Sequence, residues 1–516
     1  MPDEPDSQRD AIAFLGNPAS YGSRVGTVET LNTHISRVFL AGERAYKLKR
    51  AIKYSYVDFS TVELRRRACA AELSLNRRTA PELYLDVRAI SRRPDGSIGW
   101  GRGGTVVDWV VVMRRFAQDG LLDAIARAGG LTPALLYALA AHIAEFHAAA
   151  EPCPEFGGAA VAAEIVRNND GLLRGCRAVG FAHGEIDDLR ARSLTEAARI
   201  GAVLDRRRTA GKVRRCHGDL HLRNICVLDG RPVLFDCLEF SDRLASIDVL
   251  YDLAFLLMDL DHRGFAGFAN LVFNRYLDLT GEDDGLAAMP LFLSQRAAIR
   301  AHVAGTAIDH AVGGGDAEAG KAAEAQAYLD LARAVLTPSP ARLIAIGGLS
   351  GTGKSSLAAA LAPTLGLRPG ARVLRSDVIR KRLLGAEPEE KLPEAAYAPE
   401  ISARVYGAIR ARAAAALRAG YCAIIDAVAL RPEERQEFAA VASQAGVPFC
   451  GLWLEAPEAA LVARVGARRD DASDATGAVV RRQVALDPGP VEWHRVDAGR
   501  DLPETLAAAR QLLTLS

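Results

Sequence analysis

One pattern constrains the fold of this chain more than any other: Gly348-Leu349-Ser350-Gly351-Thr352-Gly353-Lys354-Ser355. It follows the apolar run 343–346 and precedes the Ser-, Ala- and Leu-rich run 355–365. Its glycines let the backbone turn so that several N–H groups face one point, and the dipole of a following helix adds positive potential there. The pattern therefore predicts a strand, a phosphate-binding loop and a helix in direct succession.

The residues after this loop repeat the alternation of strand and helix. We expect further buried strands at 372–375, 421–425 and 449–454, with helices between them. Alternating strands and helices favour a parallel sheet covered by helices on both faces. The sequence thus predicts an α/β P-loop domain over residues 341–516.

Within this domain, Asp377 follows the strand 372–375 and has Arg380 three residues later. An Asp at the carboxyl end of such a strand lies beside the phosphate loop, where an acceptor hydroxyl would bind. The Asp-x-x-Arg pattern resembles that of small P-loop kinases such as polynucleotide kinase, zeta toxin, gluconate kinase and chloramphenicol phosphotransferase. The resemblance implies Asp377 as the catalytic base and Arg380 as an acceptor-binding residue. A helix-capping Asp–Arg pair on the surface is the alternative interpretation.

The nucleotide contacts expected here come from the loop and from a lid. Lys354 reaches the β/γ oxygens and Ser355 binds Mg²⁺, while Asp426 ends a further strand and is placed to orient a metal-bound water. The run 461–474 resembles the lid of this kinase group, whose arginines neutralise the moving phosphoryl group; we prefer Arg468 over Arg464 and Arg469. The predicted nucleotide-binding residues of this domain are Gly348, Leu349, Ser350, Gly351, Thr352, Gly353, Lys354, Ser355, Ser356 and Arg468.

The first part of the chain has a different layout. Residues 25–112 are rich in strand-forming runs with one helical stretch at 61–78, and the chain is mostly helical after Asp119. We expect helices at 135–150, 185–207 and 246–260. A strand-rich lobe followed by a helix-rich lobe is the layout of a bilobal kinase.

A second constraining pattern lies in the helical lobe: His217-Gly218-Asp219-Leu220-His221-Leu222-Arg223-Asn224, followed by Leu234-Phe235-Asp236. Phosphoryl transfer to a hydroxyl group needs a carboxylate near the nucleophile and ligands for a metal that bridges the phosphates. Asp219 and Asn224 share one loop, and a hairpin around the turn dipeptide 229–230 returns Asp236 to them.

This pattern resembles the catalytic loop of the aminoglycoside phosphotransferase and choline kinase-like branch of the protein-kinase fold. The resemblance implies Asp219 as the catalytic base, Asn224 and Asp236 as Mg²⁺ ligands, and His217 as a support of the loop. Glycine-rich nucleotide loops of protein kinases have no counterpart in the region 32–36, which argues against a protein kinase. The branch phosphorylates many alcohols, so the fold alone names no substrate.

The strand lobe should supply a phosphate-binding lysine and its acidic partner. Lys47 and Lys49 lie on one face of the strand 45–49, because strand faces alternate. We prefer Lys47, since Ala-x-Lys resembles the kinase strand, and keep Lys49 as its rival. Glu72 is the preferred partner over Glu63.

Composition sets the remaining limits. The chain has 516 residues, 64 Lys and Arg against 63 Asp and Glu, and a net charge of +1, so overall charge gives no attraction to nucleic acid or membrane. No apolar run is long enough to span a bilayer, and the acidic start is unlike a signal peptide. Eight scattered cysteines without a Cys-x-x-Cys pair predict reduced thiols in a cytoplasmic protein.

The whole chain resembles bacterial two-domain proteins described as bifunctional aminoglycoside phosphotransferase/ATP-binding proteins. We predict an N-terminal segment (1–24), a kinase-like domain (25–312), a helix and linker (313–340) and a P-loop kinase domain (341–516) that fold independently when separated near Pro338. The resemblance implies ATP and Mg²⁺ as cofactors and hydroxyl acceptors, small molecules or, for the P-loop domain, a nucleic-acid 5′-hydroxyl end. Two alternatives remain: the P-loop domain is a regulatory ATPase, or the first domain is a pseudokinase scaffold.

Overall fold

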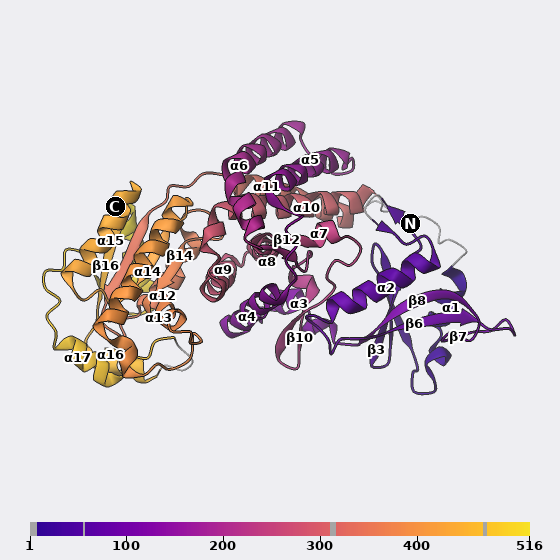
Figure 1. The fold of residues 1–516 in the computed structure, drawn as a ribbon, viewed down its shortest axis with the longest axis horizontal. Helices are drawn as coiled ribbons and strands as arrows, with labels where there is room; N and C mark the ends of the chain where they lie inside the picture. Colours follow the sequence, from indigo (N-terminus) through magenta and orange to yellow (C-terminus); the bar gives the residue numbers. More distant parts are fainter. Residues whose placement is uncertain (1–7, 55–56, 310–315, 468–471, 516) are drawn as a thin grey trace.

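A computed structural model describes residues 8–54, 57–309, 316–467 and 472–515 of the chain (Figure 1). A strand-rich lobe, a helical lobe and a third, sheet-containing part follow one another along the molecule, with the helical lobe in the middle. Among the described residues, no helix has both the length and the apolar character needed to cross a bilayer.

The first lobe is a six-stranded antiparallel sheet with the order β1-β2-β3-β8-β6-β7. Its strands are β1 (Val28–Asn32), β2 (Ser36–Ala41), β3 (Arg44–Lys49), β6 (Tyr84–Arg92), β7 (Ile98–Trp100) and β8 (Thr105–Arg114). β2 and β3 form an antiparallel hairpin, and β3 contains the expected strand 45–49. Helix α1 (Arg9–Gly16) contacts one face, and α2 (Val62–Asn76) packs on the other through Cys69. The short strands β4 (Lys53–Tyr54) and β5 (Val57–Asp58) pair beside the sheet.

The helical lobe also contains two small two-stranded sheets. Its helices are α3 (Leu122–Arg127), α4 (Pro133–Ala149), α5 (Gly158–Gly175), α6 (His183–Thr209), α7 (Asp242–Ala245), α8 (Val249–His262), α9 (Ala266–Thr280), α10 (Met289–Asp309) and α11 (Asp316–Ala334). The predicted hairpin is present as β10 (Ile225–Leu228) and β11 (Arg231–Leu234), with Asp229 and Gly230 at positive φ in the turn.

One predicted helix begins later than expected. Residues Ser246–Asp248 form β12, which pairs with β9 (Val213–Arg215), and α8 starts only at Val249. The Asp248 side chain caps α8 by accepting a hydrogen bond from the Leu250 N–H, so the chain is still extended at Asp248.

The last part of the chain is the predicted α/β fold. Its five strands are all parallel, in the order β14-β15-β13-β16-β17. The strands are β13 (Leu343–Gly348), β14 (Arg372–Arg375), β15 (Ala423–Asp426), β16 (Phe449–Glu455) and β17 (His494–Asp497). The helices are α12 (Lys354–Leu361), α13 (Ser376–Leu383), α14 (Pro399–Arg418), α15 (Pro432–Ala445), α16 (Glu458–Gly466), α17 (Gly477–Val484) and α18 (Leu502–Leu515).

Alternation along β13 explains why helices cover both faces of this sheet. Leu343 and Ala345 belong to the core that includes α14 and α15, whereas Ile344 and Ile346 belong to the core with α12 and α18. Side chains of successive strand residues point to opposite faces, so an entirely apolar strand needs cover on each. The first of these cores continues without interruption into the helical lobe through α9 and α10.

Candidate active sites

A row of alternating charges, most of them buried, lies between the sheet lobe and the helical lobe. The Lys47 Nζ donates to Glu72 Oε1 at 2.8 Å and also pairs with Asp236. Lys49 pairs with the second oxygen of Glu72 and with Glu239. Although burial opposes charge, Asp236 and Glu72 hold the pKa of Lys47 well above its ordinary value, and the two lysines lower the pKa of Glu72 to about 2. Lys47 and Glu72 are therefore firmly charged at neutral pH, whereas burial raises the pKa of Glu239.

The candidate residues for the phosphate-binding lysine and its acidic partner differ in the side chains that they contact. Lys47 reaches both Glu72 and Asp236, whereas Lys49 reaches Glu72 and Glu239 deeper in the protein, where its side chain is fully buried. Glu63 lies on the solvent face of α2 and pairs with neighbouring arginines of its own helix. Glu239 was not foreseen, because nothing in the local sequence shows that it turns inward onto Lys49.

The loop 217–224 places Asp219 beside Asn224. The Asn224 amide donates to the Asp219 carbonyl at 2.9 Å and to its carboxylate at 2.8 Å. Burial alone raises the pKa of Asp219, but the His221 ring, 3.4 Å from the carboxylate, outweighs it and the net pKa is well below the ordinary range. Asp219 is thus an ionised carboxylate that can accept a proton.

Two backbone features shape this loop. Gly218 has φ +83°, and a Cβ there would lie 2.8 Å from a methyl carbon of Leu238, so glycine is required. The His217 Nδ1 accepts a hydrogen bond from the Asp219 N–H, so its Nε2 carries the proton and donates to the Phe235 carbonyl at 2.9 Å. Burial lowers the pKa of His217, in agreement with this neutral form. His217 therefore ties the loop to the residue before Asp236.

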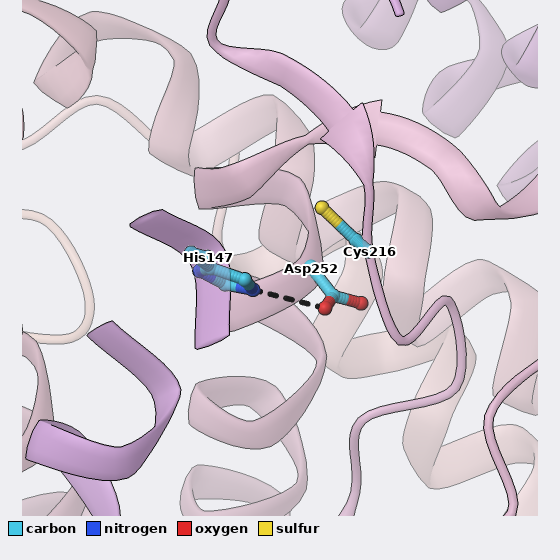
Figure 2. A group of neighbouring side chains, drawn as sticks. All are labelled: His147, Cys216 and Asp252. Atoms are coloured by element: carbon cyan, nitrogen blue, oxygen red, sulfur yellow. Dashed lines mark hydrogen bonds and ion pairs between the residues drawn. The ribbon is translucent and has the colours of Figure 1, made fainter. Parts of the chain in front are cut away.

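Asp252 of α8 holds the loop 217–224 in place through hydrogen bonds to its backbone. Its two oxygens accept the backbone N–H groups of His217 and Gly218 at 3.0 and 2.8 Å. His147 also bonds Asp252, at 3.1 Å, and together with Cys216 the three side chains lie within 4.8 Å of one another (Figure 2). The carboxylate and both ring nitrogens already have hydrogen-bond partners, so the group fits a support of the loop better than a metal site.

The hairpin brings Asp236 close to this loop. The Phe235 N–H donates to the Asn224 carbonyl at 3.0 Å, so Asn224 and Asp236 project from adjacent segments. Asp236 has φ +61°, an uncommon conformation for a residue with a side chain. Carboxylate and amide oxygens are the hard ligands that Mg²⁺ takes in proteins, so these two residues suit that ion.

The phosphate-binding loop has the backbone shape that the sequence predicts. Gly348, Gly351 and Gly353 have φ of +131°, +90° and +90°. A Cβ on Gly348 or Gly351 would lie 2.5 or 2.7 Å from a backbone oxygen of the neighbouring segment, which leaves no space for a side chain. The Lys354 Nζ donates to the carbonyls of Gly348 and Leu349, at 2.9 Å each, and so lies across the loop.

The other predicted loop residues have distinct surroundings. The Ser355 Oγ is 2.6 Å from Asp426 Oδ2, and Ser356 lies exposed on the first turn of α12. The Thr352 hydroxyl donates back to the Leu349 carbonyl at 2.8 Å. The Ser350 N–H donates to Oε1 of Gln483, a residue of α17 that no sequence pattern brings to the loop.

Asp377 and Arg380 lie on α13, directly after β14. Burial raises the pKa of Asp377, and Asp426 raises it further against the opposing charge of Arg375. The Arg380 Nη1 donates to the Ala396 carbonyl at 2.8 Å, and its buried Nε has no hydrogen-bond partner among the described residues.

The lid is described only in part. Arg468 and Arg469 lie outside the described residues. Arg464 of α16 donates to the carbonyls of Ala498 and Arg500, and therefore holds the segment after β17.

Comparisons with known proteins agree with this geometry. The "Phosphotransferase enzyme family" model matches residues 69–291, and an "AAA domain" model matches residues 343–487. A relative from Mycobacterium tuberculosis, "Uncharacterized protein Rv2004c", is 30% identical over 492 residues, which cover 91% of this chain and 92% of the relative. The chain belongs to the family of this mycobacterial protein. It is an ATP-dependent kinase in which an aminoglycoside phosphotransferase-like domain precedes a P-loop kinase domain.

Solved structures resemble the two domains separately. A choline/ethanolamine kinase family protein from Mesorhizobium loti is 16% identical, covers 64% of this chain and 99% of its own, and gives a TM-score of 0.37. A gluconokinase from Sinorhizobium meliloti is 23% identical, covers 35% of this chain and 97% of its own, and gives a TM-score of 0.24.

Proposed function

We propose that this two-domain kinase transfers the γ-phosphate of ATP to hydroxyl acceptors at two separate sites. The observation that supports it most is that each domain has an acidic side chain beside a cluster suited to Mg-ATP. In the kinase-like domain Asp219 lies next to Asn224, and in the P-loop domain Asp377 lies near Ser355 and Asp426.

In the kinase-like domain, Lys47 binds the nucleotide phosphates, and Glu72 orients the Lys47 side chain. Asn224 and Asp236 would hold Mg²⁺, which offsets charge on the phosphates when bound. Asp219 takes the proton of the acceptor hydroxyl, and the low pKa of its carboxylate keeps it ionised. The complete set of residues gives the domain the parts of an active enzyme, which weighs against a pseudokinase scaffold.

In the P-loop domain, the loop N–H groups and Lys354 bind the phosphates, and Ser355 and Asp426 would hold Mg²⁺. Asp377 is the acceptor base; its raised pKa makes it a stronger base than an exposed Asp. The Nε of Arg380, which has no hydrogen-bond partner in the part of the chain that the structure describes, is a donor for the acceptor. A regulatory ATPase needs neither of these two groups, so their presence favours transfer over regulation. We propose Arg468 as a further phosphate contact from the lid.

Two variants of the full-length protein distinguish the role of the catalytic base from that of the metal ligand in the first domain. Asp236→Ala should weaken Mg-ATP binding, whereas Asp219→Asn should leave ATP affinity near that of the parent and abolish transfer. The measurements are nucleotide titration in a Lys354→Ala background, which silences the second site, and ADP release with a panel of sugars, nucleosides, antibiotics and 5′-hydroxyl oligonucleotides. Transfer by Asp219→Asn at the parental rate would rule out the proposed base.

A further inference from the structure

The polar contacts between the two domains gather on one part of the P-loop domain. Apart from the pair of Asp261 in α8 with Arg368, those described come from α9 and the following turn Glu282–Ala288 of the kinase-like domain, which we call the α9 corner. In the described part of the chain, this corner bonds β14 and the residue before it, α13 and the segment after it, and Arg412 of α14, and makes no hydrogen bond to the phosphate-binding loop 348–355. β14 and α13 are the elements that carry Asp377 and Arg380.

The α9 corner first completes the edge of the sheet. β14 pairs with β15 on one side only, so its other edge presents unpaired backbone groups. The Asn274 side chain accepts the Val373 N–H at 2.8 Å and donates to the Ala371 carbonyl at 3.1 Å. Asn270 donates to the same carbonyl at 3.1 Å. Two asparagines thus replace the missing neighbouring strand.

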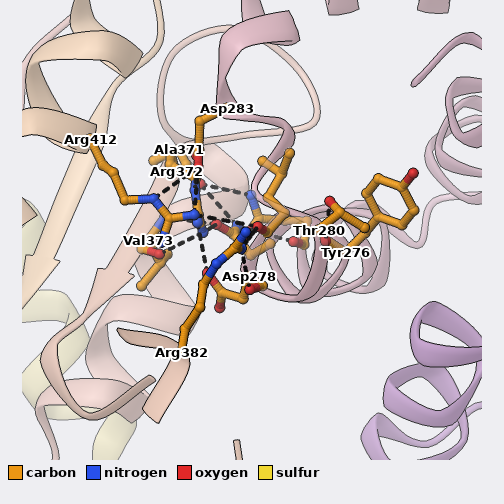
Figure 3. A network of polar contacts seen from close by, with 12 residues as sticks. Tyr276, Asp278, Thr280, Asp283, Ala371, Arg372, Val373, Arg382 and Arg412 are labelled. Carbon is orange, nitrogen blue, oxygen red and sulfur yellow. Dashed lines mark hydrogen bonds and ion pairs between the residues drawn. The ribbon is translucent and has the colours of Figure 1, made fainter. Parts of the chain in front are cut away.

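Arg372 then fixes the start of β14. It is fully buried and pairs with Asp278 at 2.7 Å and with Asp283 at 2.8 Å (Figure 3). Arg412 of α14 pairs with Asp283 from the other side, at 2.6 Å. A buried arginine with two carboxylate partners has little freedom to shift, because each displacement leaves a charge unpaired.

Arg382 connects the corner to α13 itself. Its guanidinium donates to the carbonyls of Leu277 and Asp278, which end α9, at 3.2 and 2.7 Å. Gly281 makes room for it: a Cβ at this position would lie 2.1 Å from Arg382 Nη2. A further contact, Arg275–Glu389 at 2.9 Å, holds the segment after α13. Asp377 and Arg382 share this two-turn helix, so movement of one end moves the other.

We propose that the kinase-like domain positions the acceptor side of the P-loop kinase, with Arg382 as the positioning residue for α13. The inference rests on the proposed role of Asp377. The two domains would then be joined in one chain because the second depends on the first for catalysis. The first domain fixes the helix that carries the acceptor base, while the second binds ATP by its own loop. Small displacements of a catalytic group cost up to about a hundredfold in rate.

The test uses full-length proteins in an Asp236→Ala background, so that the first site does not contribute ADP. Arg382→Ala should lower kcat/KM for the acceptor about tenfold to a hundredfold, and Arg382→Lys should recover part of the loss. The KM for ATP should stay within about twofold, since no hydrogen bond joins the corner to the phosphate loop among the described residues. Arg410→Ala is the matched control, because Arg410 pairs with Glu437 on the far side of α14 and should behave like the parent.

Hydrogen exchange supplies a readout that needs no acceptor. Arg382→Ala should speed exchange of the amides in 376–384 relative to those in 343–361. Unchanged exchange in 376–384 overturns the proposal, and so does an equal loss of ATP and acceptor affinity, which indicates general destabilisation. If no compound of the panel stimulates ADP release by the parent, the proposed transfer function fails, and the exchange result still decides whether Arg382 holds α13.

Discussion

Replacing Arg372 tests whether the two domains are one structural unit. Its guanidinium has four partners: Asp278, Asp283, the Asn274 side chain at 3.0 Å and the Val373 carbonyl at 2.8 Å. Arg372→Met keeps most of the volume but removes the ion pair of Asp278, whereas Asp283 keeps Arg412. Removing one partner of a buried ion pair costs about 3–5 kcal/mol, a large part of the roughly 5–15 kcal/mol that stabilises a domain.

The expected loss is large enough to measure by thermal unfolding. At about 2–4 °C per kcal/mol, the transition of the P-loop domain should fall by roughly 6–20 °C. Arg410→Met removes an exposed pair of the same domain and should cost less than about 1 kcal/mol. Adding Asp278→Asn to Arg372→Met should restore part of the loss, because the stranded charge is gone. A shift of Arg372→Met no larger than that of Arg410→Met refutes this reasoning.

The same ion pairs set the acid dependence of the interface. Burial opposes the charge on Asp283, but Arg372 and Arg412 outweigh it and lower its pKa. A carboxyl group with a lowered folded pKa stabilises the protein at neutral pH and loses this contribution as the pH falls through that pKa. The stability difference between the parent and Arg372→Met should therefore shrink in acid, which denaturation at several pH values can follow.

Three further predictions concern the two sites. Because the pKa of Asp377 is raised and that of Asp219 is lowered, acidification should protonate Asp377 first. Transfer by each domain is measured in the protein whose other domain has its base changed to Asn, and transfer by the P-loop domain should be lost at a higher pH than transfer by the kinase-like domain. The reverse order contradicts these assignments. Gly218→Ala should destabilise the catalytic loop and slow transfer by the first domain, whereas Gly171→Ala, with open space around it, should do neither. Lys49→Met leaves the buried Glu239 carboxyl group without its lysine, whereas Glu72 keeps Lys47, and should cost about 3–5 kcal/mol in urea unfolding; a loss below about 1 kcal/mol would show that the row of charges relaxes.

Local sequence patterns predicted the parts of each site that lie on one continuous segment. The phosphate loop, the run from His217 to Asn224 and the hairpin to Asp236 each have fixed spacing, so the chemistry of their side chains was readable without a structure. The parallel sheet of the last domain and the family resemblance followed from the same patterns.

Residues that reach a site from a distant element were not predictable in this way. Gln483 contacts the phosphate loop only because α17 packs beside it, and Glu239 turns inward only because Lys49 is there. Asp252 looks like one more acidic residue in an apolar helix, yet it anchors the catalytic loop.

The prediction that the two pieces fold independently stays a prediction, and the structure supplies an argument against it. In the sequence, Arg372 is an ordinary charged residue at the start of a strand. Its burial against α9, together with the core that continues between the domains, now leads us to expect that a fragment 341–516 exposes an unpaired strand edge and aggregates.

The most direct test of two working sites is γ-³²P transfer from ATP to the acceptor panel by four full-length proteins: the parent, Asp219→Asn, Asp377→Asn and the double variant. Each single variant should lose transfer to one set of acceptors by about 10²–10⁴-fold and keep the other, and the double variant should lose both while it still binds ATP. A double variant that labels acceptors as fast as the parent, or two single variants that lose the same acceptor equally, would contradict the account of two independent acceptor bases.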